Sequence, residues 1–244
     1  MDRNSLLGKV SNLHFERRLR MNLVTWNMEG GNDSYTNKWR NDVLRLFSQD
    51  DIKADVCCLQ ECGRPPGSAR PGSPFPNLPP GVEYYTWGGS TSRETDKHIF
   101  IYEWGVNPRC SLAVVSNELP TRVQLFEIQN NPLRPALGIE LYGRCYFTIH
   151  AKSGGGADAI DLIQLVNNSC NNPWIVAGDF NREPNTLNIV PLIICPPKTP
   201  TYNAKHVHPK SKYDYLVKSN GNQIIGLAET INASDHFPVL FRDL

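Results

Sequence analysis

Acidic, amide and imidazole side chains follow short apolar runs at several separate points of the 244-residue chain. The run WIVAG is followed at once by Asp179, and Asn181 comes two residues later. The run CCLQ is followed by Glu61, TWN ends in Asn27 and YFTIH ends in His150. Buried strands whose ends converge form the floor of a pocket, so these side chains are expected to share one site.

Three more residues of these types lie toward the C-terminus. Asp214 begins the run DYLV, and Asp235 and His236 directly precede the run FPVLF. Carboxylate and amide oxygens suit a hard divalent cation such as Mg²⁺, and two histidines suit acid–base chemistry at a phosphorus centre. A turn or a cap is the better explanation of each residue alone, and only the whole collection favours a phosphate site.

The elements that position these residues can be predicted from periodicity and composition. Strand-like runs cover residues 21–27, 54–61, 82–88, 97–103, 110–116, 122–127, 135–141, 144–150, 174–179, 213–218 and 236–242. Helical spacing of apolar side chains covers 37–49 and 158–168. Residues 63–81, rich in Pro and Gly, are expected to form a long surface loop. This strand-rich pattern predicts a mixed α/β protein of two packed sheets with helices outside.

The bulk properties exclude some classes of protein. With 25 basic and 24 acidic residues the formal net charge is +1, so net charge alone does not indicate a nucleic-acid binder. No apolar stretch approaches the roughly 20 residues of a membrane span. Residues 1–20 lack the apolar core of a signal peptide, so either the chain is not exported by that route or a signal has been removed.

Length and cysteine content lead to two further expectations. We expect residues 1–20 to form an N-terminal arm and residues 21–244 to form a single domain. The seven cysteines, an odd number, are expected to be mostly reduced and structural. One or two disulfides are the alternative if the chain is exported.

Five motifs occur in order between residues 24 and 240: WN…G, LQE, TIH, GDFN and SDHFPV. This set resembles the endonuclease/exonuclease/phosphatase superfamily, which is built on the deoxyribonuclease I fold. The stretches YTWGGSTSR, RPALGIE, HAKSGGGADA and GDFNREP narrow the resemblance to the B subunits of cytolethal distending toxins. The resemblance implies a two-sheet, four-layer α/β sandwich with its active site at one edge.

The resemblance also implies a role for each residue around the metal. Glu61 is the expected principal Mg²⁺ ligand, with Asn27 and Asp235 beside the metal and its water. His236 is the expected general base, and Asp214 would orient its ring. A carboxylate in that position fixes the tautomer that a histidine needs in order to accept a proton.

Around the second histidine the resemblance implies a matching arrangement. His150 is the expected general acid or phosphate contact, and either Glu94 or Asp96 would be its acidic partner. Asp179 and Asn181 would together position the attacking water and the scissile phosphate.

Three arginines are candidate contacts to phosphate or DNA, because a guanidinium group forms planar, bidentate contacts with phosphate: Arg93, Arg109 and Arg134. A surface ion pair explains each of them equally well. The toxins of this family read Arg-Val-Asn where this chain has Arg109–Ser111. The shorter Ser111 is therefore expected to weaken a phosphate contact at that point.

The leading hypothesis is a Mg²⁺-dependent phosphodiesterase that nicks host DNA, as the catalytic subunit of a protein like the cytolethal distending toxins. A phosphoinositide phosphatase that uses the same residues is the alternative, because the phosphate chemistry is shared. A non-catalytic binding module is disfavoured, since the whole set of site residues is present. The resemblance implies delivery subunits as partners and action in the host-cell nucleus after secretion, with an intracellular location as the alternative.

Overall fold

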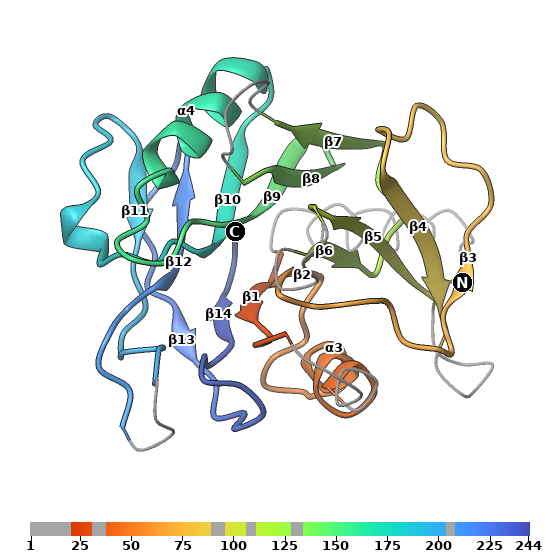
Figure 1. The fold of residues 1–244 in the computed structure, drawn as a ribbon, viewed down its shortest axis with the longest axis horizontal. Helices are drawn as coiled ribbons and strands as arrows, with labels where there is room; N and C mark the ends of the chain where they lie inside the picture. The colour runs from red at the N-terminus through yellow and green to blue at the C-terminus, as the bar shows by residue number, and fades with distance from the viewer. Residues whose placement is uncertain (1–20, 31–37, 89–95, 106–110, 128–133, 204–207) are drawn as a thin grey trace, which may run out of the picture.

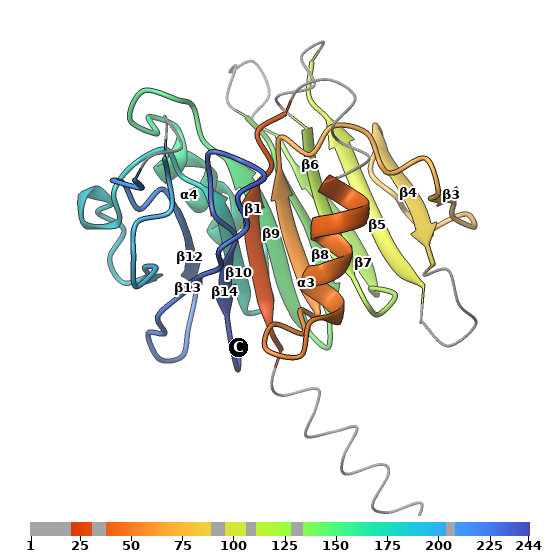
Figure 2. The same cartoon turned by 90° about the horizontal axis from the view of Figure 1, so that it is seen from below.

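Two mixed β-sheets lie face to face with helices outside them, which confirms the predicted fold class (Figures 1 and 2). The computed structural model describes residues 21–30, 38–88, 96–105, 111–127, 134–203 and 208–244. Helix α3 (Leu44–Ser48) covers the outer face of one sheet, and helix α4 (Ala159–Ser169) covers the outer face of the other. No helix within the described ranges is both long enough and apolar enough to span a membrane.

The first sheet has eight strands in the order β13-β14-β1-β2-β6-β5-β4-β3. Its strands are β1 (Leu23–Asn27), β2 (Val56–Gln60), β3 (Arg70–Pro71), β4 (Val82–Trp87), β5 (Lys97–Glu103), β6 (Ser111–Ser116), β13 (Leu227–Ala228) and β14 (Val239–Phe241). Strands β1 and β2 are parallel, and their register places Asn27 beside Gln60. Both strands therefore end at the same edge of the sheet.

The second sheet has six strands in the order β11-β12-β10-β9-β8-β7. Its strands are β7 (Arg122–Phe126), β8 (Ala136–Leu141), β9 (Arg144–His150), β10 (Trp174–Asp179), β11 (Ile193–Cys195) and β12 (Asp214–Lys218). The parallel pair β9 and β10 places His150 opposite Asp179. The antiparallel strand β12 adds Asp214 on the other side of Asp179.

Side chains alternate between the two faces of each central strand, which divides the core into layers. In β1, Leu23 belongs to the core between the sheets, whereas Trp26 packs on the outer side near α3. In β9, Tyr146 belongs to the core between the sheets, and Phe147 packs under α4. Figure 1 shows the resulting succession of helix, sheet, sheet and helix.

The layer between the sheets becomes polar toward the strand ends. The fully buried Gln60 donates through Nε2 to Thr25 Oγ1 at 3.1 Å and to Thr148 Oγ1 at 2.8 Å. Because Thr25 lies in the first sheet and Thr148 in the second, this amide joins the two sheets. It lies one residue before Glu61 in the chain.

Several details differ from the predicted elements. The helix expected over 37–49 consists of a π-helical segment, η1 (Lys38–Val43), followed by the short α3. The short strands β3, β11 and β13 were not predicted, and β3 lies within the expected loop 63–81. The six described cysteines have free thiols, and five of them are buried, which agrees with the expectation for these six.

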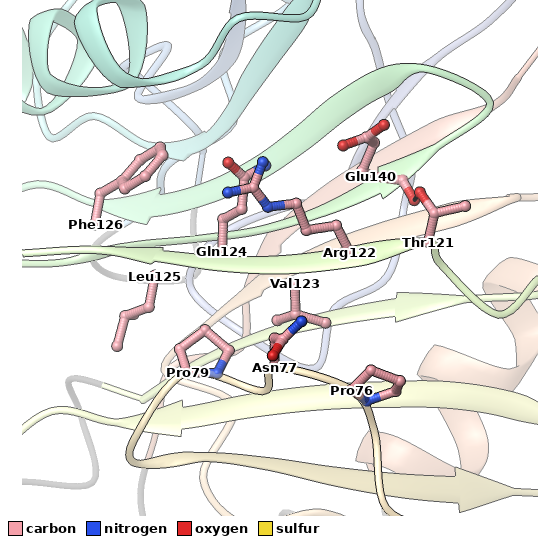
Figure 3. Close-up of a pocket in the computed structure, with 10 residues that line it drawn as sticks. All are labelled: Pro76, Asn77, Pro79, Thr121, Arg122, Val123, Gln124, Leu125, Phe126 and Glu140. Carbon is pink, nitrogen blue, oxygen red and sulfur yellow. Dashed lines mark hydrogen bonds between the residues drawn. The ribbon is translucent and has the colours of Figure 1, made fainter.

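A pocket of about 700 Å³ opens between β7 and the loop around Pro79 (Figure 3). Val123 and Leu125 point toward this loop, whereas Arg122 and Gln124 point to the other side of the strand. The lining of the pocket includes none of the predicted site residues.

Candidate active site

Residues from both sheets meet where the central strands end. Contacts of 2.8 to 3.8 Å link eight predicted site residues into one cluster: Asn27, Glu61, His150, Asp179, Asn181, Asp214, Asp235 and His236. Asn27 Nδ2 in the first sheet donates to Asp179 Oδ2 in the second at 3.0 Å. The site is therefore the polar end of the layer between the two sheets.

His236 is held by the carboxylate of Asp214, as predicted. Its Nδ1 lies 2.8 Å from Asp214 Oδ2, and Thr201 Oγ1 donates to the same oxygen at 2.6 Å. Burial alone would lower the pKa of His236, but Asp214 and Asp179 outweigh burial and raise that pKa to about 10. The carboxylates therefore favour a positively charged ring at neutral pH.

His150 lies on the other side of Asp179 and has the opposite character. Its Nε2 is 3.5 Å from Asp179 Oδ2 and 3.7 Å from Glu61 Oε1. Burial lowers the pKa of His150 well below its usual value, and Arg134 and His236 lower it further. One imidazole of the site is thus neutral and the other is charged.

The acidic partner expected for His150 is not Asp96. Within the described residues, His150 Nδ1 is buried and has no hydrogen-bond partner. Asp96 lies instead close to Gly88, where a Cβ would come within 2.4 Å of its Oδ1. It also acts on the pKa of His98, at the start of β5. Glu94, the other expected partner, lies outside the described residues.

Asp179 is the central carboxylate of the site and is only 1% exposed. Its Oδ1 accepts from the backbone N–H of Asn181 at 2.8 Å, and its Oδ2 accepts from Asn27 Nδ2 and Asn181 Nδ2. Asn181 adopts a left-handed backbone (φ 51°), a conformation that asparagine tolerates better than most residues. Burial raises the pKa of Asp179 to about 7, although His236 opposes this shift.

Glu61 and Asp235 form the more open rim of the site. Their side chains are 16% and 22% exposed, against 1% for Asp179 and 0% for Asp214. Glu61 follows β2 in a left-handed conformation (φ 47°), and Gly30 N–H donates to its Oε2 at 3.1 Å. The sequence therefore turns sharply after β2 and presents this carboxylate at the edge of the sheet.

The oxygen donors of the rim fit a hard divalent cation. Glu61 and Asp235 offer carboxylate oxygens, and Asn27 holds Glu61 through a contact of 3.5 Å. A second group, Asp179, Asp214 and His236, places one ligand atom from each residue within 4.8 Å of the others. In that group one ligand would be a histidine nitrogen, and His236 Nδ1 already lies 2.8 Å from Asp214 Oδ2. Oxygen-rich ligation at the rim is the better match for Mg²⁺.

Of the three predicted phosphate contacts, only Arg134 is described. Its Nη1 donates to the backbone carbonyls of His150 at 3.3 Å and Ala151 at 3.2 Å, and the side chain remains partly exposed. Arg134 thus fixes the end of β9 at the boundary of the site. Arg93 and Arg109 lie outside the described residues.

Ser111 has a structural task that the sequence did not predict. It is fully buried, and its Oγ accepts from the backbone N–H of Gly63 at 2.7 Å. Its side chain has no exposed surface, and the weaker phosphate contact expected at this position stays a prediction. Ser111 fastens the turn that carries Glu61.

The sequence analysis missed several residues at the site. Lys38 Nζ donates to Met28 O at 2.7 Å, and burial lowers its pKa although Glu29 and Asp235 oppose this shift. The lysine charge therefore lies near the carboxylates of the rim. Thr201 is missed because its stretch, KTPTYN, has neither helical nor strand periodicity. Glu29 Oε2 accepts from Asp235 N–H at 2.9 Å.

Comparisons with known proteins agree with this geometry. Residues 24–236 match the Endonuclease/Exonuclease/phosphatase family. The chain is 30% identical over 249 residues to the B subunit of the cytolethal distending toxin of Escherichia coli, covering 89% of each protein. It is 33% identical over 177 residues to a Salmonella typhi homolog of the toxin's B subunit, covering 68% of this chain and 65% of that relative.

Solved structures give the same result. The cytolethal distending toxin of Actinobacillus actinomycetemcomitans matches with a TM-score of 0.79 and 28% identity, over 90% of this chain and 97% of that chain. The Haemophilus ducreyi toxin matches with a TM-score of 0.78 and 28% identity, over 91% and 97%. The chain therefore belongs to the endonuclease/exonuclease/phosphatase family of hydrolases, within which it is similar to the B subunits of cytolethal distending toxins.

Proposed function

We propose that the protein is a Mg²⁺-dependent phosphodiesterase that nicks DNA, as the catalytic subunit of a protein like the cytolethal distending toxins. One observation carries most weight: two buried imidazoles, His150 and His236, flank the single carboxylate of Asp179 at 3.5 and 3.7 Å. Phosphodiester hydrolysis needs a proton taken from water and a proton given to the leaving oxygen, and two histidines can divide these tasks.

The remaining residues have supporting tasks in this proposal. Asp214 fixes the ring of His236, which is the proposed general base, and His150 contacts the phosphate or acts as the acid. Asp179 and Asn181 hold water and phosphate in line, because their mutual hydrogen bonds fix both side chains. Each such contribution typically changes the rate by about 10²–10⁴-fold.

Glu61, Asn27 and Asp235 are the residues that would hold the cation. When bound there, Mg²⁺ would stabilise charge on the phosphate and lower the raised pKa of His236, which must lose its proton before acting as a base. Arg134 fits a phosphate-binding role through its exposed part, and Arg93 and Arg109 remain proposed phosphate contacts.

Relaxation of supercoiled plasmid tests this function. The native protein should nick plasmid with Mg²⁺ and stop in EDTA, and His236→Ala should be slower by about 10²–10⁴-fold. His98→Ala is the matched control, because His98 lies at the start of β5 and its Nδ1 contacts Tyr84 OH at 2.8 Å. Equal rates for His236→Ala and the native protein, in preparations free of contaminating nuclease, would refute the assignment.

The same preparations can separate the two substrate classes. Phosphate release from a soluble phosphoinositide, measured beside nicking under matched conditions, should be much slower than nicking. Faster phosphate release, with no nicking, would move the assignment to the phosphoinositide phosphatase.

The relatives suggest how such an enzyme would act in a cell. Both curated relatives are named as toxin B subunits or homologs of them, and two solved relatives are cytolethal distending toxins. By analogy with these relatives, this protein would be secreted together with delivery subunits and would act on host DNA in the nucleus. Copurification with other secreted proteins of its source would identify such subunits.

A further inference from the structure

A segment with no motif in the sequence lies directly against the catalytic histidine. Tyr202 forms isolated antiparallel bridges with both Ser211 and His236. The next residue, Asn203, donates its backbone N–H to Asp235 O at 2.7 Å. The backbone of Tyr202 is therefore fixed against the stretch that carries the two last site residues.

The ring of Tyr202 continues an aromatic surface outward from the site. Its centroid lies 4.7 Å from that of His236, with a tilt of 45°, and 5.2 Å from that of Tyr213, with a tilt of 23°. His236 is buried, whereas both tyrosines are partly exposed. Burial raises the pKa of Tyr202, and Asp235, Tyr213 and Asp179 raise it further.

Core packing does not account for this pair of rings. Phe180 and Tyr215 also stack, at 4.0 Å, but both are fully buried in the core under α4. Tyr202 and Tyr213 belong to none of the three hydrophobic cores formed by the described residues. Each tyrosine keeps part of its surface exposed beside the site.

We infer that Tyr202 and Tyr213 form a stacking surface for a nucleobase next to the scissile phosphate, and so select nucleic acid over inositol phosphates. Every base has a flat π-face that stacks on an aromatic side chain, whatever its sequence. An inositol ring is saturated and has no such face. This inference rests on the proposed function and specifies its substrate class.

A defined substrate tests the inference. A short DNA oligonucleotide carries one cleavable phosphodiester among methylphosphonate linkages, flanked either by normal bases or by a base-free tetrahydrofuran residue. The native protein should cleave the base-bearing form about 5- to 100-fold faster, the range expected for stacking of one base.

Three variants distinguish stacking from support of the histidine. Tyr202→Leu and Tyr213→Leu should reduce the ratio of the two rates toward one, and Tyr202→Phe, which keeps the ring, should preserve it. The Tyr213 variant is included because the Tyr213 ring stacks on Tyr202 rather than on His236. Its loss therefore tests stacking without removing a ring that contacts the histidine. If both leucine variants slow the two substrates equally, the tyrosines only support the site and the inference fails.

The native protein separates this failure from failure of the proposed function. Equal cleavage of both oligonucleotides by the native protein overturns the stacking surface and leaves the nuclease assignment intact. Cleavage of neither oligonucleotide with Mg²⁺ overturns the nuclease assignment and the stacking surface together.

Discussion

Two carboxylates act on one imidazole at this site, and they differ in what holds them. Asp214 Oδ2 binds His236 and Thr201, whereas Asp179 is held by the amides of Asn27 and Asn181. Both carboxylates raise the pKa of His236, with Asp214 the larger contribution. The charge on this histidine is therefore a property of the folded site and is lost when the chain unfolds.

That shift predicts how the stability of the metal-free protein depends on pH. The pKa of His236 is about 10 in the folded chain and about 6.5 when unfolded, so its stabilisation is complete below pH 6.5. This stabilisation should be lost as pH rises through 10. Melting temperatures measured in EDTA from pH 6 to 10 should fall for the native protein, and less steeply for Asp214→Asn.

His98→Gln provides the comparison for that series. Burial lowers the pKa of His98, so this residue costs stability only as pH falls, and its variant should keep the native decline above pH 6.5. An Asp214→Asn curve parallel to that of the native protein would show that Asp214 does not hold the charge on His236.

Most of the site could be predicted at the residue scale, because its members sit in motifs at strand ends. The exceptions lie in a segment outside the named helices and strands. Thr201 and Tyr202 reach Asp214 and His236 only because an irregular segment folds back beside the last strand. No local pattern in a single sequence encodes a pairing between such distant segments.

At the scale of elements, the close approach of β9 and β10 brings His150 to Asp179. Gly178 makes this approach possible, because a Cβ at that position would lie 2.0 Å from Ile149 O in the neighbouring strand. A backbone oxygen cannot yield as a flexible side chain can. The two strands would have to separate next to both site residues.

Gly178→Ala should therefore destabilise the protein by about 1–3 kcal/mol, the usual cost of overpacking. Nicking should also slow, because His150 and Asp179 move apart. Gly67→Ala is the control, since a Cβ at Gly67 meets nothing within 4 Å. Chemical denaturation measures the difference, and equal stability of the two variants would contradict the close packing of β9 on β10.

The central strands could be predicted because each is an apolar run that ends in polar residues. Strands of two or three residues, such as β3 and β13, carry too few side chains to show a period. Ser111 shows a second limit of prediction from a single sequence. It begins β6, and whether its side chain faces a ligand or the turn after β2 depends on the pairing of β6 with β2, which a single sequence does not reveal.

At the scale of the whole molecule, the site lies where the polar strand ends of the two sheets meet. Both sheets therefore contribute residues to it. Glu61 comes from the first sheet and Asp179 from the second, and Asn27 contacts both carboxylates. Any ligand that binds this cluster favours the assembled sandwich over the unfolded chain.

Mg²⁺ should therefore raise the melting temperature of the whole protein. At 100 times its dissociation constant, a cation that binds only the folded state adds about 2.7 kcal/mol. Glu61→Gln should remove most of this gain, and Glu118→Gln, which changes an exposed residue outside the proposed metal site, should keep it. A full gain in Glu61→Gln would place the cation elsewhere, for instance at Asp179, Asp214 and His236.

The pairing of β14 with β1 also bears on how the protein is made. These strands are neighbours in the first sheet, yet the ribosome synthesises them at opposite ends of the described chain. Asp235 and His236 lie shortly before β14. A growing chain therefore carries Glu61 and His150 well before it carries His236, the second histidine of the site. The candidate site is therefore complete only after Asp235 and His236 have been added to the chain.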